Sequence, residues 1–247
     1  MMASGTAIVE AAEIVKENAR KIAAHVLEAA VADIEFEIGP SGGRLCIAGT
    51  DRSIGLMEIA EKLRAGLVLP PDVPHTLSVQ HVAQGPPFSY PNGCHIAEVE
   101  VDPETSVVAL VRHAMVNDFR TVINPLLIEG QAHGGVVQGL GQAIFEHVVY
   151  DESGQPLAGS FMDYALPRAE AAPSFTVAYH PAPAKTNPLG VKGCGEAGCV
   201  GSMPSIMNAL VDALSEFGVA HIDMPATPER VWRAIREARA LEPARFG

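Results

Sequence analysis

Glycine is concentrated in the stretch Asn187–Gly201, which limits what this chain can fold into more than any other. It contains five glycines, two cysteines and only two charged residues, Lys192 and Glu196. Glycine has no Cβ atom, so a backbone this rich in it can turn tightly and lie close to a ligand. Ordering such a loop costs conformational entropy, so the stretch is either a binding site or a plain connector before a helix.

A second glycine-rich stretch, residues 130–147, is expected to be helical although it contains glycines at 130, 134, 135, 139 and 141. Each interior glycine costs a helix about 1 kcal/mol relative to alanine. Two explanations fit equally well. A ligand approaches the helix backbone, or the helix packs tightly on a sheet.

The remaining elements alternate irregularly between helices and strands. Apolar spacing predicts a long helix over 5–32, and period-two alternation predicts strands over 33–38 and 44–48. The strongest signal is a hairpin of strands 94–101 and 106–116. A second hairpin is predicted with strands 148–150 and 157–161 around a turn at 151–155, and a further strand follows at 175–180. Ser202 is expected to cap a helix ending at Phe217, and Thr227 to cap one that begins at Pro228. Without regular βαβ alternation the fold class is α+β, either as one domain or as two subdomains of about 1–125 and 126–247.

The charge and cysteine content exclude several kinds of protein. The formal net charge of −12 argues against a nucleic-acid partner and an anionic membrane surface. No apolar run approaches the roughly 18 residues of a spanning helix, and the first residues do not resemble a signal peptide. The four cysteines form no C-x-x-C pair, so reduced thiols and a cytoplasmic location are expected.

Common catalytic motifs do not explain the two glycine-rich stretches. The sequence contains no H-E-x-x-H, G-x-S-x-G or phosphate-loop pattern. Gly193-x-Gly195-x-x-Gly198 formally matches a dinucleotide fingerprint, but it lacks a clear preceding strand and the later acidic residue. What remains is a set of amides that can hydrogen-bond a polar ring cofactor, Gln138 among them. Glu196 also remains as a candidate, because a lone carboxylate can act as a general base.

Several long motifs, in the same order along the chain, resemble the molybdenum hydroxylase family, which includes xanthine dehydrogenase, aldehyde oxidase and aerobic carbon monoxide dehydrogenase. They are residues 130–141 (GQAHGGVVQGLG), 160–167 (SFMDYALP), 187–198 (NPLGVKGCGEAG), 92–105 (NGCHIAEVEVDPET) and 224–232 (MPATPERVW). The resemblance covers nearly the whole chain. It is to the C-terminal part of the molybdopterin-binding large subunit, and it implies an oxidoreductase.

The resemblance implies a role for four residues. Glu196 matches the family's general base, which deprotonates a hydroxyl on molybdenum so that water-derived oxygen reaches a carbon of the substrate. Gln138 matches a glutamine beside the cofactor, and Cys194 and Gly195 match the residues that precede the base. The protein is expected to supply no metal ligand, because a pterin dithiolene holds the molybdenum.

The resemblance also implies partners. The chain lacks an upstream half that holds the molybdopterin cofactor, so a partner chain is expected to share it. Iron–sulfur clusters, with or without FAD, are expected on other subunits of a hetero-oligomer. Where relatives have Asp-x-Gly, this chain has Arg120 in the glycine position.

Two other functions remain open. The chain could be a non-catalytic cofactor-binding or assembly protein, or a truncated remnant of such a subunit. A thiol enzyme using Cys194 or Cys199 with a histidine is the third alternative.

Overall fold

The computed structural model describes residues 1–40, 42–85, 88–182 and 185–241, and these fall into two units. Unit 1 comprises Met1–Pro87 with Asn187–Leu189, and unit 2 comprises Phe88–Thr186 with Gly190–Gly247. The division therefore lies at residues 87 and 88, not near residue 125 as suggested above. The physical reason is that the hairpin before residue 125 pairs and packs with elements that follow it.

Unit 1 is built on the long helix α1 (Met2–Leu27), which ends where Glu28 adopts a left-handed conformation. Beside it lies an antiparallel sheet of β1 (Ile34–Gly39), β2 (Gly42–Ile47) and β3 (Ser53–Gly55), followed by α2 (Leu56–Arg64). Their shared core includes Ile22, Leu45 and Ile59. Only the later half of α1 contributes to this core; Ile8, near the start of the helix, is 69% exposed.

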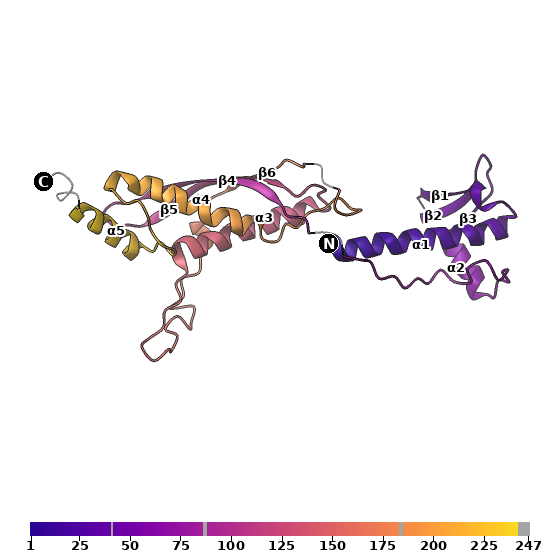
Figure 1. Cartoon of the computed structure of the whole chain (residues 1–247), viewed down its shortest axis with the longest axis horizontal. Coiled ribbons are helices and arrows are strands. Elements are labelled where there is room, and N and C mark those ends of the chain that lie inside the picture. Colours follow the sequence, from indigo (N-terminus) through magenta and orange to yellow (C-terminus); the bar gives the residue numbers. More distant parts are fainter. Residues whose placement is uncertain (41, 86–87, 183–184, 242–247) are drawn as a thin grey trace. The chain divides into compact units, whose positions relative to one another are not determined.

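Unit 2 contains a second sheet with the order β4-β5-β6. β4 (Asn92–Val101) and β5 (Val108–Asp118) form the antiparallel hairpin predicted from the sequence, and β6 (Phe175–Tyr179) pairs with β5 in parallel. Helices α3 (Pro125–Leu140) and α4 (Ala197–Leu214) pack against each other, and α4 packs on β4 (Figure 1). The class is α+β, as expected.

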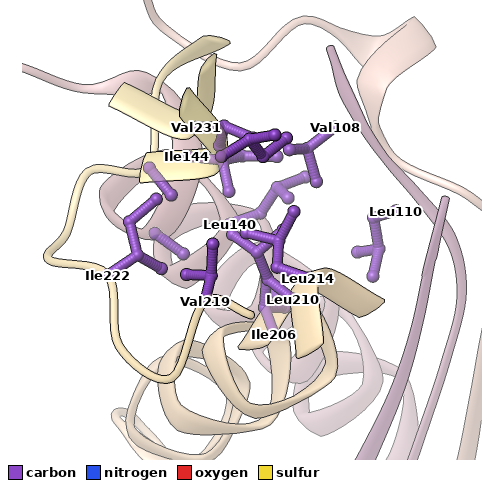
Figure 2. Close-up of a cluster of buried hydrophobic side chains, with 13 residues drawn as sticks. Val108, Leu110, Leu140, Ile144, Ile206, Leu210, Leu214, Val219, Ile222 and Val231 are labelled. Carbon is purple, nitrogen blue, oxygen red and sulfur yellow. The ribbon is translucent and has the colours of Figure 1, made fainter. Parts of the chain in front are cut away.

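Short elements and one further helix complete the second unit. A π-helical turn (Gly141–Phe145) extends α3, 3-10 turns lie at Ala169–Ala171 and Ser215–Phe217, and α5 (Pro228–Leu241) closes the chain; in unit 1 another 3-10 turn covers Val31–Asp33. Thr227 accepts a hydrogen bond from the Arg230 backbone N–H at 3.4 Å, which confirms it as the α5 cap. Val108, Leu140, Leu210 and Val231 belong to the core that α3, α4 and α5 share with the hairpin (Figure 2).

None of the helices in the described part of the chain is long and apolar enough to cross a bilayer.

Candidate functional site

The glycine-rich stretch is fixed to β5 by a buried ion pair. The Lys192 ammonium donates to the Asp118 carboxylate, and both side chains are only 8% exposed. Asp118 also accepts hydrogen bonds from the backbone N–H groups of Arg120, at 2.9 Å, and Ala182, at 3.1 Å. Burial alone would raise the pKa of Asp118, but these donors outweigh it and lower that pKa. Lys192 thus has a structural role, because it neutralises the carboxylate that orders the loop.

Arg120 occupies the turn opposite this loop in a conformation that suits glycine. Its φ is 57°, in the left-handed region. Residue 120 also forms a bridge with Val191, and the Thr121 N–H donates to the Gly190 carbonyl at 3.0 Å. A non-glycine residue with this backbone typically costs about 1–2 kcal/mol. The chain therefore keeps a left-handed backbone at this position, although arginine stands where the family's Asp-x-Gly pattern has glycine.

Glu196 is the N-cap residue of α4, with an exposed side chain. The helix thus starts at Ala197, several residues before the cap expected at Ser202. Ser202 is instead fully buried inside α4, where its hydroxyl donates to the Cys199 carbonyl at 3.1 Å. A carboxylate at the start of an 18-residue helix faces the positive end of the helix dipole. The structure therefore places the proposed base at the end of a rigid element.

Glycines bring the backbones of α3 and α4 into direct contact. A Cβ atom on Gly135 would lie 3.0 Å from the Gly198 Cα, and one on Gly139 would lie 2.0 Å from the Ser202 Oγ. The contacting residues advance by four positions in both helices, from 135 to 139 in α3 and from 198 to 202 in α4, so the two helices run parallel. Of the two explanations for a glycine-rich helix, close packing accounts for these two positions, although the surface they meet is a helix and not a sheet.

Other glycines leave the backbone open. A Cβ atom on Gly130, Gly134, Gly193 or Gly195 would meet no described atom within 4 Å. Gly130 and Gly134 lie one turn apart on one face of α3, and Gly193 and Gly195 lie just before Glu196. Both glycine-rich stretches therefore expose backbone where a bulky ligand could approach.

The amide of Gln131 joins the two stretches directly. Its Nε2 donates to the Gly195 carbonyl at 2.7 Å. Gln138 follows seven residues later on the same face of α3, which corresponds to about 10 Å along the helix axis. Gln138 is exposed, and no hydrogen bond of its side chain is found among the described residues. Its amide is thus available to a ligand, whereas that of Gln131 holds the loop.

A cavity of about 300 Å³ lies beside Glu196. It is lined by Tyr90, Pro91, Asn92, Gly93, His95, Asn117, Glu196, Ala197, Val200 and Gly201. Gln138, Cys194 and Gly195 are not among these residues. The structure therefore places Glu196 between this cavity and the open glycines, and it does not bring all four predicted residues into one pocket.

His95 and Asn117 are two polar residues of this cavity that were not identified as site residues from the sequence. His95 Nε2 lies 3.4 Å from Asn117 Oδ1, and its ring lies against Gly201 of α4. Burial lowers the pKa of His95, although the Asn117 contact opposes this. The hairpin pairs Gly93 with Asn117. The predicted strands, 94–101 and 106–116, include neither Gly93 nor Asn117, and the register also shifts at Glu98 and Val99, so no signal in the sequence brings the two side chains together.

The cysteines offer little support for a thiol enzyme. Cys194 and Cys199 are both half-buried. Burial, and then the charge of Glu196, raise the pKa of Cys199, which disfavours the nucleophilic thiolate. Among the described residues, no group of three or more His, Cys, Asp or Glu side chains is placed to hold a metal ion.

Comparison with known sequences gives one clear family match and several long relatives. The family described as a molybdopterin cofactor-binding domain matches residues 1–173. The carbon monoxide dehydrogenase large chain of Hydrogenophaga pseudoflava is 36% identical over 235 residues, which are 95% of this chain and 28% of that protein. The nicotine 6-hydroxylase large subunit of Paenarthrobacter nicotinovorans is 35% identical, over 94% of this chain and 28% of that protein.

Solved structures agree with these sequence matches. A Cu,Mo-CO dehydrogenase in its carbon monoxide reduced state superimposes with a TM-score of 0.83 and 33% identity, over 95% of this chain and 29% of that one. Quinoline 2-oxidoreductase from Pseudomonas putida 86 superimposes with a TM-score of 0.78 and 32% identity, over 92% of this chain and 28% of that one. The chain thus spans a little over a quarter of the length of these relatives.

Proposed function

The chain belongs to the molybdopterin cofactor-binding domain family, and on that premise we propose that it is the C-terminal part of the large subunit of a molybdenum hydroxylase. In this proposal, it forms one wall of the cofactor site. The remaining wall comes from the part of the large subunit that this chain does not contain. Iron–sulfur clusters, with or without FAD, on further subunits carry the electrons away.

The observation that carries the proposal is the position of Glu196. It is an exposed carboxylate at the N-terminus of α4, and open backbone at Gly193 and Gly195 directly precedes it. A bulky, polar cofactor fits beside glycines that carry no Cβ. The cofactor, when bound, supplies a two-electron oxidation that no amino-acid side chain provides.

The residues of this chain then have separate tasks. Glu196 accepts a proton at its carboxylate during oxygen transfer to a carbon of a small substrate. Gln138 donates a hydrogen bond from its free amide to the cofactor. The backbone of Cys194 and Gly195 lies against the cofactor, and Gln131 holds that backbone through the Gly195 carbonyl. The names of the relatives mention carbon monoxide, nicotine and quinoline, which are all small molecules.

Replacing the base tests this proposal. In the assembled, molybdenum-loaded enzyme, Glu196→Gln should lower turnover by about 10²–10⁴-fold, because the variant cannot accept the proton. Molybdenum content, measured by elemental analysis, should stay at the wild-type level, because the substitution is isosteric at an exposed position.

Glu104→Gln is the matched control, since Glu104 is an exposed acid in the turn between β4 and β5. It should leave turnover within twofold of wild type. Turnover of Glu196→Gln within threefold of wild type, at equal molybdenum content, would rule Glu196 out as the base. It would favour the non-catalytic alternative.

A further inference from the structure

Residues 147–168, here called the arm, leave the end of α3 and return without packing on the core of unit 2. Figure 1 shows the arm as a long loop that projects from the end of α3, away from the other helices and the sheet of its unit. The sequence predicted a second hairpin here. The structure retains only one bridge, Tyr150 to Pro156, with the Leu157 N–H donating to the Val149 carbonyl at 2.7 Å.

The arm is held in place at both ends and ordered along its length. At the base, the Tyr164 hydroxyl donates to Glu146 Oε2 at 2.6 Å. Asp151 caps the first turn by accepting from the Ser153 and Gln155 backbone N–H groups, each at 2.9 Å. The Ser160 hydroxyl closes the second turn on Asp163 at 2.6 Å. The first contact ties the base of the arm to Glu146, which follows the π-helical turn, and the other contacts order the two turns of the arm locally.

That surface is strongly apolar. Phe161 is 86% exposed and Met162 is 93% exposed. Other large apolar side chains of the arm are also exposed: Val148, Val149, Tyr150, Leu157 and Leu166. Phe161, Met162 and Leu166 also line a hollow of about 620 Å³ at the base of the arm. A cluster of large exposed apolar side chains on an ordered segment is typical of an interaction site.

The charges around these side chains indicate the kind of surface that covers them. Between residues 146 and 170 the chain has five acidic residues, Glu146, Asp151, Glu152, Asp163 and Glu170, and one arginine, Arg168. An anionic membrane would repel this segment. A protein groove with an apolar floor and a basic rim would complement it.

We propose that the arm docks into such a groove on the part of the large subunit that this chain does not contain. This inference rests on the proposed function, in which that part completes the cofactor site. The relatives are more than three times as long as the region this chain matches, so more than two thirds of their length lies outside it and is available to form such a groove. Docking buries Phe161 and Met162 and links the two walls of the site.

The test measures binding between purified proteins. The full chain is titrated with the co-encoded large-subunit segment that corresponds to the region upstream of this match, produced as a separate polypeptide. Phe161→Asp and Met162→Asp should each raise Kd at least tenfold, because each places a charge in the apolar floor. Val107→Asp is the control, since it puts the same charge on an exposed apolar residue in the hairpin turn, and it should leave Kd within twofold.

Two further measurements separate docking from folding and from catalysis. The melting temperature of the isolated chain should be unchanged by Phe161→Asp, because this side chain is already exposed. Glu196→Gln should bind the segment like wild type, so a wrong assignment of the base would leave the docking result intact. The proposal is overturned if Phe161→Asp binds normally or if the segment fails to bind the wild-type chain. The isolated chain could also self-associate in sedimentation experiments, and Phe161→Asp could abolish that association. This result would mean that the arm binds a second copy of the chain, and it would also overturn the proposal.

Discussion

His113 is a fully buried base that the fold keeps neutral. Its side chain is 0% exposed, and its ring contacts the rings of His95 and Phe175 edge-on, at centroid distances of 5.3 and 5.9 Å. Burial, and then the nearby charge of His95, lower its pKa from 6.5 to about 4. Ser205 Oγ lies at the edge of hydrogen-bond range, 3.5 Å from His113 Nε2. Protonation of His113 would thus place a charge in the interior of unit 2.

This burial predicts a stability that depends on pH. The unfolded chain takes up the proton near pH 6.5 and the folded chain only near pH 4. Between these values the unfolded state binds more protons, so the free energy of unfolding should fall as the pH is lowered through this window. The loss from His113 should be about 2 kcal/mol between pH 7 and pH 4.5, measured by urea denaturation at both pH values.

The control for this prediction is an exposed histidine. His113→Gln should reduce the pH-dependent loss to what the other groups contribute, among them His95. His221→Gln should leave the loss unchanged, because the His221 side chain is 81% exposed. A His113→Gln variant with the full wild-type loss would show that another group titrates in this window.

At the scale of elements, the close packing of α3 on α4 distinguishes glycines that the fold needs from glycines that it leaves free. A Cβ atom on Gly139 would lie 3.0 Å from the Cys199 carbonyl oxygen in addition to its clash with Ser202, whereas one on Gly134 would lie in open space. Gly139→Ala should therefore destabilise the chain by about 1–3 kcal/mol, because the helices must separate. Gly134→Ala should stabilise it by up to about 1 kcal/mol through helix propensity. Thermal and urea unfolding of both variants measures the difference.

The Gly134→Ala variant also tests whether the cofactor approaches the backbone of α3. If Gly134 remains open in the assembled enzyme, Gly134→Ala should keep the wild-type molybdenum content. A loss of molybdenum without a loss of stability would mean that the cofactor approaches α3 at this turn. Equal stability of Gly139→Ala and Gly134→Ala would contradict the helix contact described here.

Elements with a strong local pattern were predictable, and elements that depend on a distant partner were not. The β4–β5 hairpin and the start of α5 follow from alternation and from the Thr227–Pro228 cap. The predicted start of α4 was wrong. Ser202 is a good capping residue by type, but it is buried inside the helix against Gly139 of α3. The hairpin expected around Asp151 shrinks to one bridge, since its strands have no sheet to extend.

The candidate site was predictable to a similar degree. Glu196 and Gln138 could be named because long motifs resemble a family, not because their spacing reveals a pocket. His95 lies within the motif at 92–105, but nothing in that motif links it to Asn117 on the neighbouring strand. Sequence patterns report local periodicity, whereas a cavity forms from side chains that only tertiary packing brings together.

On the scale of the whole molecule, the chain has hydrophobic clusters in both units, and the main clusters share no residue. The cluster of unit 1 is formed by α1, α2 and the first sheet, and the larger cluster of unit 2 by α3, α4, α5 and the hairpin. A boundary near residue 125 would have cut the second cluster between β5 and α3. Units with separate cores can unfold separately, since neither loses core contacts when the other opens.

We therefore expect two unfolding transitions in calorimetry of the isolated chain. Ile59→Ala should lower the transition of unit 1, and Leu210→Ala that of unit 2. Both side chains are 0% exposed, and truncating a buried side chain of this size costs about 2–5 kcal/mol. Each variant is the control for the other, because each should leave the second transition within about 1 °C of wild type. A single transition that both substitutions lower would show that the two cores unfold as one cooperative unit, and that the division at residues 87 and 88 is geometric only.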